Sequence, residues 1–175
     1  MDSLDSLALQ LGEALQAAGA QVTTAESCTG GGIAEAITRV AGSSAWFEAG
    51  FVTYSNRQKT LQLDVPDALF EQVGAVSEEV VTAMVHGAPA ARRGALRLGG
   101  ERHRRAGWRG ASGKPVGTVW LAWLDGEQLR TERQVFAGDR AAVRQQTQVR
   151  ALQVLLALLA EEKALRCSNR EATMV

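Results

Sequence analysis

Three consecutive glycines that directly follow a polar cluster constrain the fold of this chain more than any other feature. The segment TTAESCTGGG covers residues 23–32; the residues before it have the pattern of a short strand, and IAEAITRV after it that of an amphipathic helix. The cluster therefore lies at a strand-to-helix turn, where the N–H groups of the first helical turn have no partner within the helix. Such a turn favours negative charge, and it suits either a phosphate site or an oxyanion hole beside a nucleophile.

The rest of the chain alternates between helix and strand patterns. Leucines at helical spacing predict a helix from residue 4, and a strand is expected within AWFEAGFVTYSN. Helices are predicted over 57–63, 66–72 and 77–88, followed by a hairpin around Asp125-Gly126 and a long helix after Asp139. We therefore expect a single α/β domain over 1–162, a three-layer α/β/α sandwich with a mixed sheet, and a flexible tail over 163–175.

Composition excludes several classes of protein. The 19 basic residues balance 19 acidic ones, so overall charge gives no reason to expect a nucleic-acid or membrane partner. No apolar run is long enough to span a membrane, and the acidic N-terminus does not resemble a signal peptide. Two distant cysteines indicate a reduced, cytoplasmic protein, and the two histidines, His86 and His103, offer no metal-binding spacing. No metal or cofactor is expected.

Three positions carry more polar functionality than a core needs. These are Glu26 to Thr29 before the glycines, Tyr54 to Lys59 at the end of a strand, and Asp139-Arg140 at the start of the last helix. Strand ends and helix N-termini often gather at one edge of an α/β sheet, where ligand sites form.

Ser27, Tyr54 and Lys59 form a candidate catalytic set. A serine nucleophile needs a base, a lysine can serve where desolvation or a neighbouring cation lowers its pKa, and a tyrosine can relay a proton. Two alternatives remain open at this point. Ser27 and Thr29 could simply cap a helix, and Cys28 could be the nucleophile, because a helix N-terminus lowers the pKa of a thiol.

The motifs of this chain closely resemble those of the CinA carboxy-terminal domain family, over roughly residues 5–160. They are TTAESCTGGG, AGSSAWFEAGFVTYSNRQK, GAVSEEVV, KPVGTVWLAW and FAGDRAAVRQQ. The resemblance implies an amidohydrolase that converts nicotinamide mononucleotide to nicotinate mononucleotide and ammonia, in pyridine nucleotide salvage. Family members also tend to self-associate, which implies a homo-oligomer.

The resemblance also implies roles for individual residues. Ser27 matches the family's nucleophilic serine, and Tyr54 and Lys59 match the residues that activate it. For substrate binding it implies Asn56, Arg140 and the N–H groups of the turn, which are those of Thr29, Gly30 and Gly31. Glycines there would let a ligand approach the backbone closely.

One segment, residues 90–111, departs from the family pattern. The family has a hydrophobic strand and then a loop reading S-G-[IV]-A-G-P-x-G-G, whereas this chain has seven arginines within residues 92–109. Codons for residues 101–108 (ERHRRAGW) can be chosen that, read one base later, give S-G-I-A-G-P-D-G, and residues 98–100 can then read L-A-V. We interpret the segment as the product of a shifted reading frame.

This departure predicts damage to the fold and to activity, and it leaves one alternative function open. Burying several unpaired arginines is costly, so the segment should not form a buried strand, the sheet should be weakened, and this chain should be nearly inactive. The alternative is a non-catalytic binding module that uses the Arg-rich loop 92–109 for nucleic acid or a protein partner, with binding that weakens steeply with salt.

Overall fold

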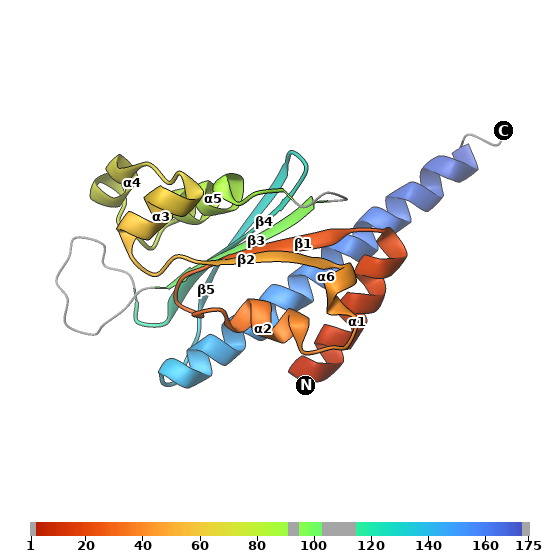
Figure 1. Cartoon of the computed structure of the whole chain (residues 1–175), viewed down its shortest axis with the longest axis horizontal. Coiled ribbons are helices and arrows are strands. Elements are labelled where there is room, and N and C mark those ends of the chain that lie inside the picture. The colour runs from red at the N-terminus through yellow and green to blue at the C-terminus, as the bar shows by residue number, and fades with distance from the viewer. Residues whose placement is uncertain (1–2, 91–94, 103–114, 173–175) are drawn as a thin grey trace.

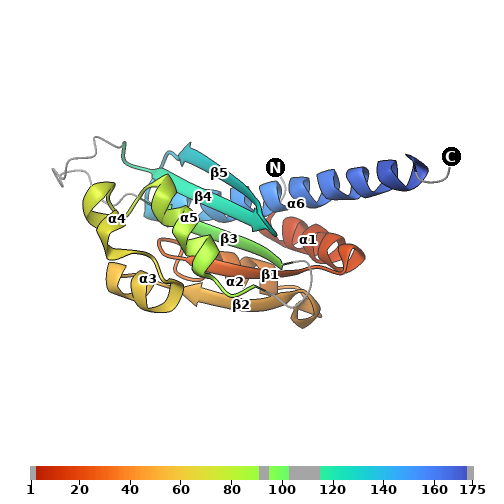
Figure 2. The same cartoon turned by 90° about the horizontal axis from the view of Figure 1, so that it is seen from above.

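A mixed five-stranded sheet lies between two layers of helices in the computed structural model, which describes residues 3–90, 95–102 and 115–172 (Figures 1 and 2). The strands are β1 (Gln21–Glu26), β2 (Phe47–Val52), β3 (Ala95–Arg102), β4 (Thr118–Asp125) and β5 (Gln128–Val135). They lie in the order β2-β1-β3-β4-β5, with β1 parallel to both of its neighbours and the β3-β4 and β4-β5 pairs antiparallel. The predicted α/β sandwich with a mixed sheet is confirmed.

Helices from both ends of the chain cover one face of the sheet, and three consecutive helices cover the other. One layer holds α1 (Leu4–Ala18), α2 (Gly32–Thr38) and α6 (Arg140–Ala172), and the other holds α3 (Asn56–Leu63), α4 (Asp67–Gln72) and α5 (Glu78–Gly87) (Figures 1 and 2). A short 3₁₀ turn over Ser43–Ala45 leads into β2. In the described ranges, no helix is both long and apolar enough to cross a membrane.

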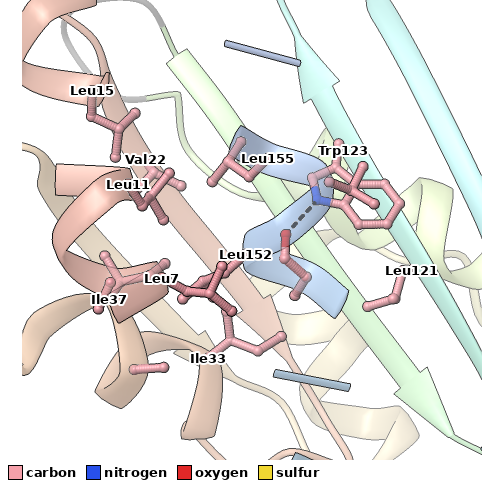
Figure 3. Close-up of a cluster of buried hydrophobic side chains, with 14 of the residues drawn as sticks. Leu7, Leu11, Leu15, Val22, Ile33, Ile37, Leu121, Trp123, Leu152 and Leu155 are labelled. Atoms are coloured by element: carbon pink, nitrogen blue, oxygen red, sulfur yellow. Dashed lines mark hydrogen bonds between the residues drawn. The ribbon is translucent and has the colours of Figure 1, made fainter. Parts of the chain in front are cut away.

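The largest core cluster fills the space between the sheet and the α1/α2/α6 layer (Figure 3). Leu7, Leu11 and Leu15 of α1 are almost fully buried there, as their helical spacing predicts. The indole N–H of Trp123 donates to the backbone carbonyl of Ala151 at 3.2 Å, which satisfies the ring's polar atom inside the core. Each such buried leucine contributes about 1.5–3 kcal/mol, so this layer contributes much of the stability.

The predicted loss of the strand at 95–102 is wrong. β3 is the central strand of the sheet, paired in parallel with β1 over residues 95–100 and antiparallel with β4 over residues 96–102. Backbone pairing on both edges satisfies its N–H and C=O groups, and Gly99 and Gly100 within it are buried. A Cβ at Gly99 would lie 2.8 Å from a methyl carbon of Val85, so the missing side chain lets α5 pack closely on β3. The frameshift interpretation concerns the gene and stays a prediction. Of the anomalous segment 90–111, residues 91–94 and 103–111 lie outside the described residues.

The last helix also differs from the sequence prediction. Asp139 caps α6 as predicted, since its carboxylate accepts from the N–H of Ala142 at 2.8 Å. The helix then continues through residues 163–172, where a flexible tail is predicted, and its C-terminal part extends beyond the rest of the domain (Figure 1).

The sheet topology gathers polar segments at one edge. The chain leaves β1 through α2 to reach β2, and it returns through α3, α4 and α5 on the other face to reach β3, on the opposite side of β1. Because β1, β2 and β3 are parallel, their carboxyl ends lie at the same edge. Ligands of open α/β sheets bind at such an edge, where the connections diverge.

Candidate active site

Ser27 and Lys59 meet at this edge in a buried hydrogen bond. The Lys59 Nζ donates to the Ser27 Oγ at 3.1 Å and to the backbone carbonyl of Thr53 at 3.1 Å. Ser27 is 3 % exposed and Lys59 only 1 %. A buried lysine amine in contact with a serine hydroxyl is an arrangement that can serve as a base and a nucleophile.

Local structure places both side chains. Ser27 directly follows β1, and its N–H donates to the carbonyl of Gly100 in β3 at 3.2 Å. Lys59 lies in α3, whose N-cap is Ser55: the Ser55 hydroxyl accepts from the N–H of Gln58 at 3.2 Å. The loop from β2 into α3 is in turn fixed to β1, because the N–H of Thr53 donates to the carbonyl of Glu26 at 2.8 Å.

The glycine turn has a conformation that favours glycine at two positions. Gly30 has φ +61° and Gly31 has φ +88°, both in the left-handed region. The N–H of Gly30, one of the three donors expected for the substrate, donates to the carbonyl of Ser27 at 3.0 Å. The backbone N–H groups of Thr29 and Gly31 have no hydrogen-bond partner within the part of the chain that the structure describes.

Glu26 caps the helix, a role that one of the open alternatives gives to Ser27 and Thr29. Its buried carboxylate accepts from the N–H of Ile33 at 2.9 Å, from the N–H of Ala34 at 2.8 Å and from the hydroxyl of Thr29 at 2.6 Å. It thus satisfies two of the open N–H groups at the start of α2 and also ties the turn together. The hydroxyl of Ser27 is not used for capping and remains directed to Lys59.

Tyr54 and Arg140 are brought together, although they are 86 positions apart. The Arg140 Nη2 donates to the Tyr54 hydroxyl at 2.6 Å, and Tyr54 is 45 % exposed. Tyr54 directly follows Thr53, whose carbonyl accepts from Lys59, so the predicted tyrosine lies beside the serine–lysine pair. Asn56 is the first residue of α3 and is exposed.

Arg144 is a site residue that sequence reasoning missed. It is partly buried on α6, and its Nη2 donates to the backbone carbonyl of Thr29 at 2.5 Å. A Cβ at Gly30 would lie 3.3 Å from the same nitrogen, so the guanidinium lies directly against the glycine turn. The sequence feature that could have identified Arg144 is its spacing from Arg140. Residues four positions apart lie on the same side of a helix.

Three other features considered in the sequence can be located among the described residues. Among the described residues, no group of three or more His, Cys, Asp or Glu side chains could hold a metal ion. Of the Arg-rich segment 92–109, residues 95–102 form β3, and the remainder lies outside the described ranges. The rival nucleophile Cys28 is buried, at 4 % exposure.

Sequence comparison identifies relatives over nearly the whole chain. The model of the CinA C-terminal domain matches residues 4–159. The chain is 64 % identical over 161 residues to a Pseudomonas putida protein named nicotinamide-nucleotide amidohydrolase PncC, covering 90 % of this chain and 98 % of that one. It is 52 % identical over 157 residues to the protein of the same name from Escherichia coli K12, covering 87 % and 92 %.

A solved structure has the same fold. The crystal structure of the competence damage-inducible protein A (ComA) from Klebsiella pneumoniae subsp. pneumoniae MGH 78578 superposes with a TM-score of 0.84 at 35 % identity. The match covers 91 % of this chain and 98 % of that chain. The resemblance inferred from the motifs is therefore confirmed.

Proposed function

The chain belongs to the CinA C-terminal domain family, and we propose that it hydrolyses the carboxamide of nicotinamide mononucleotide to nicotinate mononucleotide and ammonia. This is the activity in the names of its 64 % and 52 % identical relatives. The observation that carries the proposal is the buried 3.1 Å contact between Lys59 Nζ and Ser27 Oγ at the carboxyl edge of the sheet. The pathway would be pyridine nucleotide salvage.

In this proposal Ser27 is the nucleophile and Lys59 is the general base. Lys59 takes the hydroxyl proton as Oγ attacks the carboxamide carbon, and it returns that proton to the departing nitrogen, which leaves as ammonia. Water, deprotonated by Lys59, then attacks the resulting ester, and nicotinate mononucleotide leaves as Ser27 regains its proton. The amide nitrogen leaves as ammonia, and the carboxylate of the product holds the original amide oxygen and one oxygen from water.

The open N–H groups of Thr29 and Gly31 are the candidates to stabilise the oxyanion that forms in each step. They belong to a turn held by hydrogen bonds to Glu26 and Arg144, and preorganised donors lower the barrier because they need no reorientation during the reaction. Tyr54 and Arg140 would complete the wall of the site, and Asn56 would contact the substrate from the start of α3.

Ammonia release from nicotinamide mononucleotide tests the proposal. The substitutions are best made in a version of the chain that carries the family loop S-G-I-A-G-P-D-G over 101–108. There Ser27→Ala should abolish turnover, whereas Cys28→Ala should leave much of it. Lys59→Ala and Tyr54→Phe should each lower kcat more than they raise KM, as expected for groups that act in the transition state. An active Ser27→Ala protein paired with an inactive Cys28→Ala protein would contradict the assignment.

A further inference from the structure

Thr53 has a fully buried side-chain hydroxyl that forms no hydrogen bond within the part of the chain that the structure describes. Both of its backbone groups are used: the N–H donates to the carbonyl of Glu26 at 2.8 Å, and the carbonyl accepts from Lys59 Nζ at 3.1 Å. Burying a hydroxyl without a partner costs free energy, because the group loses its hydrogen bonds to water. The reaction proposed above makes no use of this hydroxyl, so that reaction alone does not explain its burial.

The pairing of β1 with β2 places the hydroxyl on the same side of the sheet as the serine–lysine pair. Glu26 pairs with Val52 in the parallel ladder, so Ser27 and Thr53 follow as neighbours at the carboxyl ends of the two strands. Val52 points toward the start of α2, because its Cγ2 atom lies 3.5 Å from the Cβ position of Gly31. Side chains alternate along a strand, so that of Thr53 points to the opposite side, where α3 lies. Ser27 points to that side as well, since its hydroxyl accepts a hydrogen bond from α3.

Lys59 gains a positive charge in the proposed reaction, at a position that is only 1 % exposed. When it takes the proton of Ser27, an O–H bond breaks and an N–H bond forms at Nζ. The new charge is costly where water has little access, unless nearby oxygens accept hydrogen bonds from the ammonium. The carbonyl of Thr53 is one such acceptor, and only a few covalent bonds separate it from the hydroxyl oxygen of the same residue. Small side-chain rotations therefore bring that hydroxyl within reach of Nζ.

We propose that Thr53 is a positioning residue whose hydroxyl accepts a hydrogen bond from Lys59 when that amine is protonated. This inference rests on the proposed function for the step in which the charge forms. Thr53 undergoes no covalent change: its oxygen stabilises the ammonium while the proton is held for the departing nitrogen, and the contact ends when the proton is passed on. The hydroxyl thus gains its partner in the charged state, and an interaction that is made only there lowers the barrier.

Thr53→Val tests the proposal, because it removes the hydroxyl and keeps the shape of the side chain. In the chain that carries the family loop, kcat for ammonia release from nicotinamide mononucleotide should fall about 10–100-fold, since hydrogen bonds to charged groups contribute about that factor. KM should change little, because the contact forms only after the substrate has bound. Tm should stay the same or rise, because the hydroxyl that is removed has no partner. Thr53→Ser restores the hydroxyl and should recover most of the lost kcat.

Thr23→Val is the matched control, because Thr23 is also fully buried and its hydroxyl also has no partner among the described residues. It lies in β1, about 13 Å from Ser27 along the strand. This variant should keep the kcat of its parent chain, and its Tm should stay the same or rise. An equal fall of kcat in Thr23→Val would overturn the proposal. A Thr53→Val protein with unchanged kcat and a lower Tm would make its hydroxyl a structural group and would overturn the proposal as well.

Serine labelling separates this proposal from the amidase proposal. A fluorophosphonate reacts with an activated serine: the Ser27 oxygen bonds to phosphorus, fluoride leaves and Lys59 takes the proton, so no carboxamide is required. In the unmodified chain, mass spectrometry should show Ser27 labelled about tenfold or more slowly after Thr53→Val than after Thr23→Val. This difference without ammonia release from any of the proteins would refute the amidase reaction and support the role of Thr53. Equal labelling rates in the two variants, even with ammonia release, or no labelling of Ser27 in the unmodified chain, would refute that role.

Discussion

Replacing Glu26 with glutamine should destabilise the domain, because it disrupts the buried hydrogen bonds that cap α2. The carboxylate accepts three hydrogen bonds, at 2.6, 2.8 and 2.9 Å, and is fully buried. A glutamine has one acceptor oxygen, so its NH₂ group must face at least one of the N–H donors of α2. In the better orientation the oxygen keeps Thr29 and Ile33, and the N–H of Ala34 is left without a partner. Losing one charge-assisted bond and weakening two others predicts a loss of about 2–4 kcal/mol in the free energy of unfolding.

Urea unfolding measured by circular dichroism gives that free energy directly. Glu35→Gln is the control: it removes another carboxylate from the first turn of α2, but this side chain is 59 % exposed and pairs with Arg39 at the surface. It should cost no more than about 1 kcal/mol. Because Ser27 is adjacent to Glu26, turnover by Glu26→Gln should also fall, by about tenfold or more. A Glu26→Gln protein as stable as Glu35→Gln, with unchanged turnover, would refute the capping role.

Three further outcomes are expected. The pKa of Glu132 is lowered chiefly by its hydrogen bond to Arg150, so its stabilisation is complete above the ordinary carboxyl pKa of about 4.3 and is lost as the pH falls through the lowered value. Urea unfolding from pH 7 to 3 should therefore show the stability of Glu132→Gln converging with that of the unmodified chain at acid pH; parallel curves would contradict this. Gly87→Ala should lower Tm, since the new Cβ would lie 1.7 Å from the Leu63 carbonyl oxygen, and overpacking costs about 1–3 kcal/mol; an unchanged Tm would count against that packing. Restoring S-G-I-A-G-P-D-G over 101–108 should greatly increase ammonia release, and equal rates would show that the loop is dispensable.

Much of the fold could be predicted from periodicity and turn residues. The leucine spacing of α1, the N-cap of α5 at Ser77 and the β4-β5 hairpin all appear where the pattern places them. The central strand could not, because the arginines of its segment suggest exposure. Strand pairing depends on backbone groups and on the neighbours β1 and β4, which a local pattern does not reveal.

The candidate site, like the fold, could be predicted from the sequence only in part. The contact between Ser27 and Lys59 could be anticipated, since residue chemistry and the family motifs point to the same pair. Glu26 and Arg144 could not be assigned. The distinction between a capping and a catalytic carboxylate lies in the direction of the side chain, and Arg144 reaches the glycine turn only because α6 packs beside α2.

Peptide mapping by mass spectrometry after rapid quenching tests the central claim most directly. The chain carrying the family loop would be mixed with nicotinamide mononucleotide and quenched during turnover. The account predicts an ester on the peptide that contains Ser27, localised by fragmentation to Ser27 and absent from Ser27→Ala. An adduct localised to Cys28, or continued ammonia release by Ser27→Ala, would contradict the role assigned to the serine–lysine pair.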